Sequence, residues 1–222
     1  MRRRLPVSIE LGILAALGLS VGASAQQGAE AGVHGSAATL DAFLAEVRTL
    51  TADFHQELWT ADQRLLETEV GTLALSRPNR FRWSYLQPTE LIVVADGTQL
   101  WTYDVELEQV TVAPLDEAVT SSPAALLSGD SSVRDGFDVA QTYSADGLDW
   151  IKLTPKTDGT DFTSVLIGFS GSAPQRLELV DGLNQVTRIE FANVVINPEV
   201  ADGVFDFEPP EGVDVIGKEK EG

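Results

Sequence analysis

Residues 76–88 decide the fold and read Ser76-Arg77-Pro78-Asn79-Arg80-Phe81-Arg82-Trp83-Ser84-Tyr85-Leu86-Gln87-Pro88. From Phe81 to Tyr85 aromatic and polar residues alternate, which is the period-two pattern of a strand with one apolar face. Phe81, Trp83 and Tyr85 should therefore form a wide apolar wall on one side of that strand. Arg80 and Arg82 alternate with them and are expected to face solvent.

Arg77 stands immediately before Pro78. Proline pushes the residue before it into an extended conformation and supplies no backbone N–H, so Arg77 is expected at a strand end or a bend. Its guanidinium is planar and carries five hydrogen-bond donors. The sequence therefore predicts a cation at the rim of the apolar wall.

Most of the remaining chain consists of short alternating runs. Eleven such runs lie between residues 53 and 193, and Asp-Gly pairs, which favour hairpin turns, occur at Asp96, Asp135, Asp146, Asp158, Asp181 and Asp202. Sequential strands joined by tight turns predict a mainly β fold, an incomplete antiparallel β-barrel of about eleven strands. There is no βαβ alternation and no Gly-rich phosphate loop, which argues against a nucleotide-binding α/β fold.

An N-terminal helix is expected from Ser36 or Thr39 to Thr51. Apolar residues recur there at spacings of three and four, which places them on one stripe. The stripe either packs against the sheet or helps to cover a ligand cavity. Its members are Leu40, Phe43, Leu44, Val47, Leu50 and Phe54.

Two short helical pieces are expected between Pro114 and Asp130, at residues 116–119 and 123–127. Proline suits the first helical position of the second piece, and Gly129 suits its end. The second piece should cover one end of the half-barrel, as a lid or as a plain plug. Its residues are Pro123, Ala124, Leu126 and Leu127.

The first residues have the pattern of a signal peptide. Three arginines at residues 2–4 precede an apolar run at 11–22 and an Ala-Ser-Ala site at 23–25. The run is too short to span a bilayer, although a retained membrane anchor is the alternative. We expect a cleaved signal peptide at 1–25, a disordered lead-in at 26–35 and a single domain at 36–217, soluble in the periplasm.

The composition excludes several kinds of function. The formal net charge is −19, which argues against nucleic acid and anionic lipid surfaces as partners. The absence of cysteine excludes disulfides, thiolate metal sites, cysteine nucleophiles and a lipidated cysteine. His34 and His55 are isolated, and the carboxylates of Asp130, Asp135, Asp158 and Asp161 follow no calcium-loop spacing, so we expect no metal, no cofactor and no enzyme.

Large apolar side chains are more numerous than one face of a small sheet requires. They predict a hydrophobic cavity that could hide acyl chains, because each buried methylene gains about 0.8 kcal/mol. The expected cavity wall consists of Phe81, Trp83, Tyr85, Trp101, Tyr103 and Trp150.

Four blocks of sequence resemble those of a known family. They are residues 52–56 (Ala-Asp-Phe-His-Gln), residues 77–103 (Arg-Pro-Asn-x-Phe-x-Trp, Gln-Pro and Val-Ala-Asp-Gly-x-x-Leu-Trp-x-Tyr), residues 153–156 (Leu-Thr-Pro-Lys) and residues 205–213 (Phe-Asp-Phe-Glu-Pro-Pro-Glu-Gly-Val). In this order they resemble the LolA family of periplasmic outer-membrane lipoprotein carriers.

The resemblance implies a function and a role for Arg77. A carrier of this family accepts acylated lipoproteins from an inner-membrane ABC release complex and delivers them to an outer-membrane receptor, which is LolB-like. It works as a monomer, without catalysis. The matching arginine bonds the backbone of the lid helix in the empty protein, so Arg77 would be a lid latch.

Two other interpretations remain open at this point. A periplasmic envelope-stress sensor domain of the same half-barrel shape would bind lipid or a protein, but such regulators normally carry a second domain. A secreted hydrolase would need a catalytic motif, and the chain has no Gly-x-Ser-x-Gly sequence.

Overall fold

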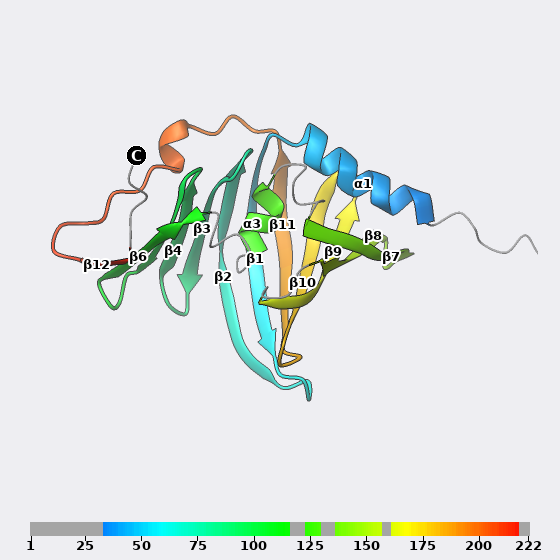
Figure 1. The fold of residues 1–222 in the computed structure, drawn as a ribbon, viewed down its shortest axis with the longest axis horizontal. Helices are drawn as coiled ribbons and strands as arrows, with labels where there is room; N and C mark the ends of the chain where they lie inside the picture. Colours follow the sequence, from blue (N-terminus) through cyan, green and yellow to red (C-terminus); the bar gives the residue numbers. More distant parts are fainter. Residues whose placement is uncertain (1–32, 116–122, 130–135, 157–160, 218–222) are drawn as a thin grey trace, which may run out of the picture.

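The computed structural model describes residues 33–115, 123–129, 136–156 and 161–217 (Figure 1). The expected signal peptide at 1–25 and the first helical piece at 116–119 lie outside these ranges. Within them, no helix is both long enough and apolar enough to cross a membrane.

One sheet of twelve strands forms most of the molecule, and it is strongly curved (Figure 1). The strand order is β12-β6-β5-β4-β3-β2-β1-β11-β10-β9-β8-β7. The elements are α1 (Val33–Glu46), β1 (Thr49–Trp59), β2 (Leu65–Ser76), β3 (Arg80–Gln87), β4 (Leu91–Asp96), β5 (Gln99–Asp104), β6 (Gln109–Pro114), α3 (Pro123–Ser128), β7 (Phe137–Ala145), β8 (Leu148–Pro155), β9 (Phe162–Ser170), β10 (Ala173–Asp181), β11 (Val186–Ile196), η1 (Asp202–Val204) and β12 (Asp214–Gly217).

The eleven expected strands are all present as β1 to β11, and neighbours in the sheet pair antiparallel. The mainly β half-barrel fold is therefore confirmed. The chain adds a twelfth strand, β12, which pairs parallel with β6 and makes the sheet mixed. The two edge strands, β12 and β7, are not paired with one another, so the sheet stays open.

The N-terminal helix differs from its expected bounds at both ends. It begins at Val33 and stops at Glu46 instead of Thr51. The following residues join the sheet, where Thr49 pairs with Ser76 of β2. Asn197 stabilises this early exit, because its Oδ1 accepts the N–H of Arg48 at 2.7 Å and its Nδ2 donates to the carbonyl of Glu46 at 3.1 Å.

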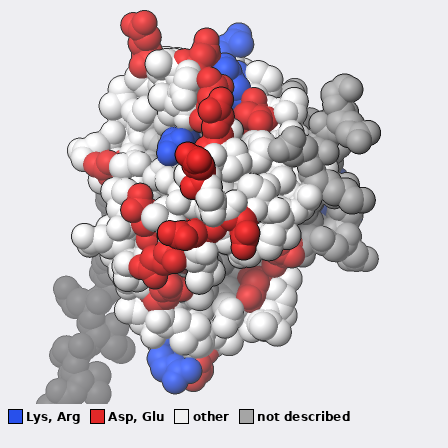
Figure 2. All heavy atoms as spheres, turned by 90° about the vertical axis from the view of Figure 1, so that its left-hand side faces the viewer, with Lys and Arg blue, Asp and Glu red and all other residues white. Residues whose placement is uncertain are grey.

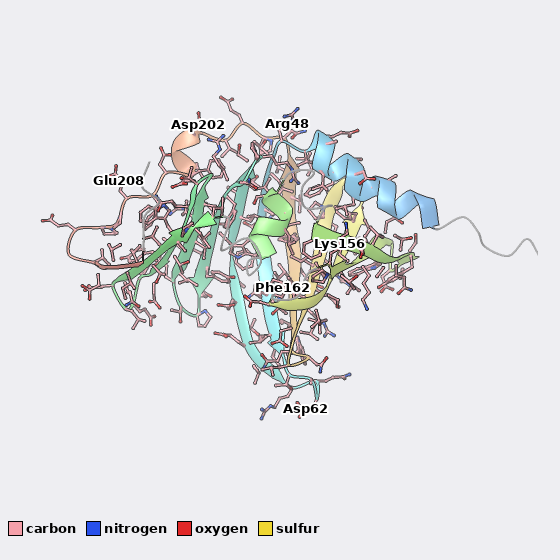
Figure 3. The ribbon with its side chains drawn as sticks, in the orientation of Figure 1. Arg48, Asp62, Lys156, Phe162, Asp202 and Glu208 are labelled. Atoms are coloured by element: carbon pink, nitrogen blue, oxygen red, sulfur yellow. The ribbon has the colours of Figure 1, made fainter. Side chains whose placement is uncertain are left out.

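The sheet has an inner face, which we define as the face covered by α1 and α3, and an opposite outer face. On the inner face the main core unites side chains of both helices with those of the strands. Leu40, Phe43 and Val47 of the expected helical stripe are buried there, while Leu50 and Phe54 reach the same core from β1. Figure 3 places Arg48 at the end of the molecule near α1 and Asp62 at the far tip of the β1–β2 hairpin.

The outer face carries a second, smaller apolar cluster. It consists of Val94, Trp101, Val110 and Val112, with Ile92, Tyr103, Phe207 and Val213 packed against it. The last two belong to the C-terminal segment, which crosses the outer face before it adds β12 to the sheet edge (Figure 1). Acidic side chains are spread over the side of the molecule formed by this edge, with few basic ones among them (Figure 2).

Candidate functional site

Arg77 lies in the short turn between β2 and β3. Its Nε donates a hydrogen bond to the carbonyl oxygen of Val47 at 2.8 Å, and its Nη1 donates to the carbonyl oxygen of Gly129. Its Cζ lies 4.7 Å from the centre of the Phe43 ring. The backbone N–H of Arg77 donates to the carbonyl of Arg48 at 2.8 Å. Arg77 therefore connects the end of α1, the β2–β3 turn and the end of α3, at a strand end as the sequence predicted.

Both carbonyl groups that accept from the guanidinium lie at helix C-termini. Val47 follows α1, and Gly129 follows α3. The last carbonyls of a helix lack partners within it and carry partial negative charge. A permanently charged group with donors in one plane suits two such carbonyls. Without it, each buried acceptor would cost about 1–3 kcal/mol.

A second hydrogen bond joins α3 to the same turn. The backbone N–H of Asn79 donates to the carbonyl of Ser128, the last residue of α3, at 3.1 Å. Asn79 has a φ of 60°, in the left-handed region that asparagine tolerates better than most residues. The Pro-Asn pair after Arg77 thus directs a backbone donor at the end of α3.

Helix α3 packs on the inner face against β2 and β3. Leu126 and Leu127 are buried in the main core, and of Pro123 and Ala124 the structure describes the backbone. The expected helix with Gly129 directly after its end is confirmed. Its function as a movable lid remains a prediction.

Beneath α3, aromatic rings from three strands meet on the inner face. The ring of Phe54 on β1 lies 4.7 Å from that of Trp83 and 5.2 Å from that of Tyr85, both on β3. Phe191 on β11 lies 6.2 Å from Trp83. We call these four residues the aromatic cluster. Phe81, which is 1% exposed, continues the same row of β3 into the main core.

Gly71 makes room for the aromatic cluster. It lies on β2 between Phe54 of β1 and Tyr85 of β3, with which it is in register. A Cβ at this position would lie 2.6 Å from Cζ of Phe54 and 2.0 Å from the carbonyl oxygen of Ser84. A glycine is therefore required for the Phe54 ring to pack against β2 at this position.

Polar side chains lie beside the aromatic cluster on the same face. Gln56 Nε2 donates to Oε2 of Glu69, its partner across the β1–β2 ladder, at 2.5 Å. Burial raises the pKa of Glu69, the neighbouring Glu67 raises it further, and the Gln56 hydrogen bond lowers it. Burial likewise raises the pKa of Tyr85, with Glu69 as the second cause. The phenol of Tyr85 therefore stays neutral at physiological pH.

Comparison with known proteins identifies the family. Residues 45–208 match LolA, described as the outer membrane lipoprotein carrier protein. The chain belongs to the LolA family. It is 39% identical over 184 residues to the outer-membrane lipoprotein carrier protein of Dechloromonas aromatica, covering 83% of this chain and 88% of that protein. The corresponding protein of Methylococcus capsulatus is 42% identical over 177 residues, covering 80% and 85%.

A solved structure supports the same fold. The chain resembles an uncharacterized conserved protein of Thermus thermophilus with a TM-score of 0.51 at 12% identity, over 82% of this chain and 98% of that one. At this identity the likeness concerns the fold alone. The prediction of a transport protein rather than an enzyme rests on the LolA family itself, whose members are carriers.

Three of the six expected wall residues require a correction in this LolA-family protein. Trp101 and Tyr103 belong to the outer-face cluster, and Trp101 pairs with Val94, which lies opposite Arg82 and not opposite Trp83. Trp150 also faces outward, because it alternates along β8 with Ile151 and Leu153, which both enter the main core. The other three expected wall residues lie on the inner face, where they form what we call the inner wall: Phe81, Trp83 and Tyr85.

Sequence reasoning missed three contributors to the inner wall. The sequence places Phe54 both at the end of the helical stripe and in a Phe-x-Gln strand, but does not predict it as part of the wall. Phe191 and Gly71 were not singled out. Alternation within β11 could have indicated Phe191, but the need for Gly71 depends on ring packing across three strands.

The described residues offer little to a metal ion. Among them, no group of three or more histidine and carboxylate side chains is placed to bind one. His55 is exposed on β1.

Arg80, which was expected to face solvent, forms an ion pair with Asp202 at 3.1 Å, and its side chain remains 34% exposed.

Proposed function

We propose that this protein carries acylated lipoproteins through the periplasm in a cavity that opens between the sheet and α3. The observation that carries this proposal is Arg77, which holds the ends of α1 and α3 together above an inner face lined with aromatic rings. Family membership supports the same function.

Apolar energetics explain why such cargo needs a carrier. An acyl chain of about sixteen carbons gains on the order of 12 kcal/mol when it leaves water, so it cannot cross an aqueous compartment unaided. A carrier must cover the chain and later release it. A lid that closes over an empty interior favours release, because opening it costs free energy that lowers the net affinity.

The hydrogen bonds of Arg77 have a free energy suited to such a lid. The bonds to the carbonyls of Val47 and Gly129 favour the closed arrangement by a few kcal/mol, as a rough sum of two bonds at about 1–3 kcal/mol each. Acyl burial exceeds this amount. Cargo can therefore displace the latch, and the latch can close again after release.

The route of the cargo follows from the proposed family role. The carrier would accept lipoproteins from an inner-membrane ABC release complex and deliver them to a LolB-like receptor at the outer membrane. It would act as a periplasmic monomer once the signal peptide is removed. The acidic surface suits a carrier that must not adhere to anionic lipid surfaces (Figure 2).

Native mass spectrometry of the protein purified gently from periplasm tests the proposal. We expect adducts of the wild-type protein whose masses correspond to acylated polypeptides. These adducts should disappear when the purified receptor is added. A protein that carries no acylated polypeptide, and that also fails to bind a synthetic tripalmitoylated lipopeptide, would contradict it.

A further inference from the structure

Two buried polar atoms of the inner face, at the aromatic cluster, have no hydrogen-bond partner in the described part of the chain. They are Nε1 of Trp83, which is a donor, and Oε1 of Gln56, which is an acceptor. Trp83 is 2% exposed, so bulk water does not reach its indole N–H. An unpaired buried polar group destabilises the state that contains it. The closed protein thus leaves one donor and one acceptor unsatisfied at the site of the proposed cavity.

The two groups lie in one neighbourhood. Gln56 follows Phe54 by two residues on β1, so both point to the inner face. Phe54 contacts the Trp83 ring at 4.7 Å between centroids, and Gln56 lies against Tyr85, the next inward residue after Trp83 on β3. Trp83 and Gln56 therefore flank the Phe54–Tyr85 pair.

We propose that the Trp83 N–H and the Gln56 amide oxygen recognise the ester and amide groups that join acyl chains to cargo. The carbonyl oxygen of an ester or amide linkage accepts from Trp83 Nε1. The N–H of an amide-linked chain donates to Gln56 Oε1. The inference rests on the proposed carrier function and adds to it a chemical preference for acyl linkages over bare hydrocarbon.

The chemistry explains why these positions are polar. A hydrocarbon tail offers neither donor nor acceptor, so an all-apolar wall would hold it equally well. A linkage group that enters with the chain leaves water and needs new partners. Trp83 and Gln56 would supply them, and their own unsatisfied state in the empty protein would end at the same time. Cargo loading is therefore favoured by hydrogen bonds that satisfy both the cargo linkage and the two side chains.

Binding of matched lipids tests the donor. The probes are dipalmitoylglycerol, which has two ester carbonyls, and dihexadecylglycerol, its ether analogue without carbonyls. We expect the ratio of ester affinity to ether affinity to be about five- to tenfold higher in the wild type than in Trp83→Phe. Trp101→Phe, which removes an indole from the outer-face cluster, is the matched control and should keep the wild-type ratio.

A spectroscopic measurement on the wild type avoids any dependence on the folding of the variant. The indole N–H of Trp83, assigned among the four tryptophans, should move downfield in the NMR spectrum when the diester binds and stay in place with the diether. For the acceptor, an N-palmitoyl peptide should bind tighter than its N-methyl-N-palmitoyl analogue, and Gln56→Met should abolish that difference.

The outcomes separate the two proposals. If neither lipid binds the wild type, the carrier function fails and this inference fails with it. If both lipids bind, but Trp83→Phe keeps the wild-type ester preference or the indole signal responds alike to both, the linkage recognition is wrong and the carrier function stands. A lost preference in Trp83→Phe with a selective indole shift supports the inference.

Discussion

The guanidinium of Arg77 donates to the carbonyl of Val47 at 2.8 Å, across 30 residues of sequence. The same group bonds Gly129, 52 residues away in the other direction. One side chain thus connects the ends of α1 and α3 through two hydrogen bonds. Because Arg77 directly follows the end of β2, the sheet positions the guanidinium that bonds the ends of both helices.

Arg77→Leu should loosen α3 while the sheet stays folded. The substitution removes both side-chain donors and leaves the carbonyls of Val47 and Gly129 unpaired, so the closed state should weaken by tenfold or more, at about 1–3 kcal/mol per group. Hydrogen exchange at residues 123–129 should accelerate accordingly. Cargo should load normally but transfer to the receptor more slowly, because closure no longer assists release.

Arg82→Leu is the matched control for this variant. Arg82 is half-buried, lies on the outer face, and its side chain makes no hydrogen bond or ion pair within the described ranges. The substitution removes the same charge without touching α3, so exchange at 123–129 should stay at the wild-type rate. Equal transfer rates for wild type and Arg77→Leu would exclude the latch.

Phe81→Leu should weaken acyl binding more than it weakens folding. Phe81 is 1% exposed on the inner wall, and the smaller side chain leaves a gap that costs about 1–3 kcal/mol of stability. Lipopeptide affinity measured by fluorescence should fall several-fold. Phe207→Leu, a matched change in the outer-face cluster, should leave the affinity unaltered, and an equal loss in both variants would remove Phe81 from the wall.

Phe81→Glu is the harsher version of the same test. A carboxylate at this position would have no partner in the apolar core, and an unpaired buried charge destabilises strongly. We expect loading and delivery to be lost. Normal cargo uptake by a folded Phe81→Glu protein would show that position 81 does not line the cavity.

Gly71→Ala should be unusually destabilising for the addition of one methyl group. The new Cβ would meet backbone at 2.0 Å and the Phe54 ring at 2.6 Å, so β2, β3 or Phe54 must move. We expect a loss of about 1–3 kcal/mol or more in urea unfolding. Gly182→Ala, where a Cβ would meet nothing within 4 Å, should change stability little. Similar midpoints for the two variants would contradict the packing argument.

Local pattern was sufficient to predict most of the sheet. The alternation of Phe81, Trp83 and Tyr85 identified β3 and its inner face, and Asp-Gly pairs such as Asp96-Gly97, with Gly97 at a φ of 103°, marked hairpins. These features depend on residues close in sequence. The same holds for α3, whose proline and glycine boundaries are both local.

Long-range contacts account for what the pattern did not predict. Strand β5 is apolar on both faces, because Leu100 enters the main core while Trp101 is covered by Phe207 from the C-terminal segment. The sequence of β5 alone does not determine which of its apolar residues faces inward. The early end of α1 likewise depends on Asn197, whose side chain arrives from the far end of the chain.

Asp96→Asn should destabilise the protein in a pH-dependent way. Oδ1 of Asp96 accepts from the N–H and Oγ1 of Thr98 and the N–H of Gln99, each at 2.8 Å, and Oδ2 accepts from Trp101 Nε1 at 3.0 Å. Burial alone would raise the pKa of this carboxyl, but the bonds from Gln99, Trp101 and Thr98 together lower it below its ordinary 3.8. An asparagine would present an amide N–H to one of these donors.

The sign of the pH effect follows from that lowered pKa. The unfolded chain binds the proton more tightly than the folded protein, so the stabilisation by Asp96 is complete above about pH 4 and is lost as pH falls through the folded value. Urea unfolding should place Asp96→Asn about 1 kcal/mol below wild type at pH 7, a modest figure because the site is partly exposed. The gap should narrow as the pH falls below that lowered pKa, where wild-type Asp96 is itself protonated. Asp206→Asn removes an exposed carboxylate and should show no such gap, so a pH-independent difference for Asp96→Asn would exclude the charge as its cause.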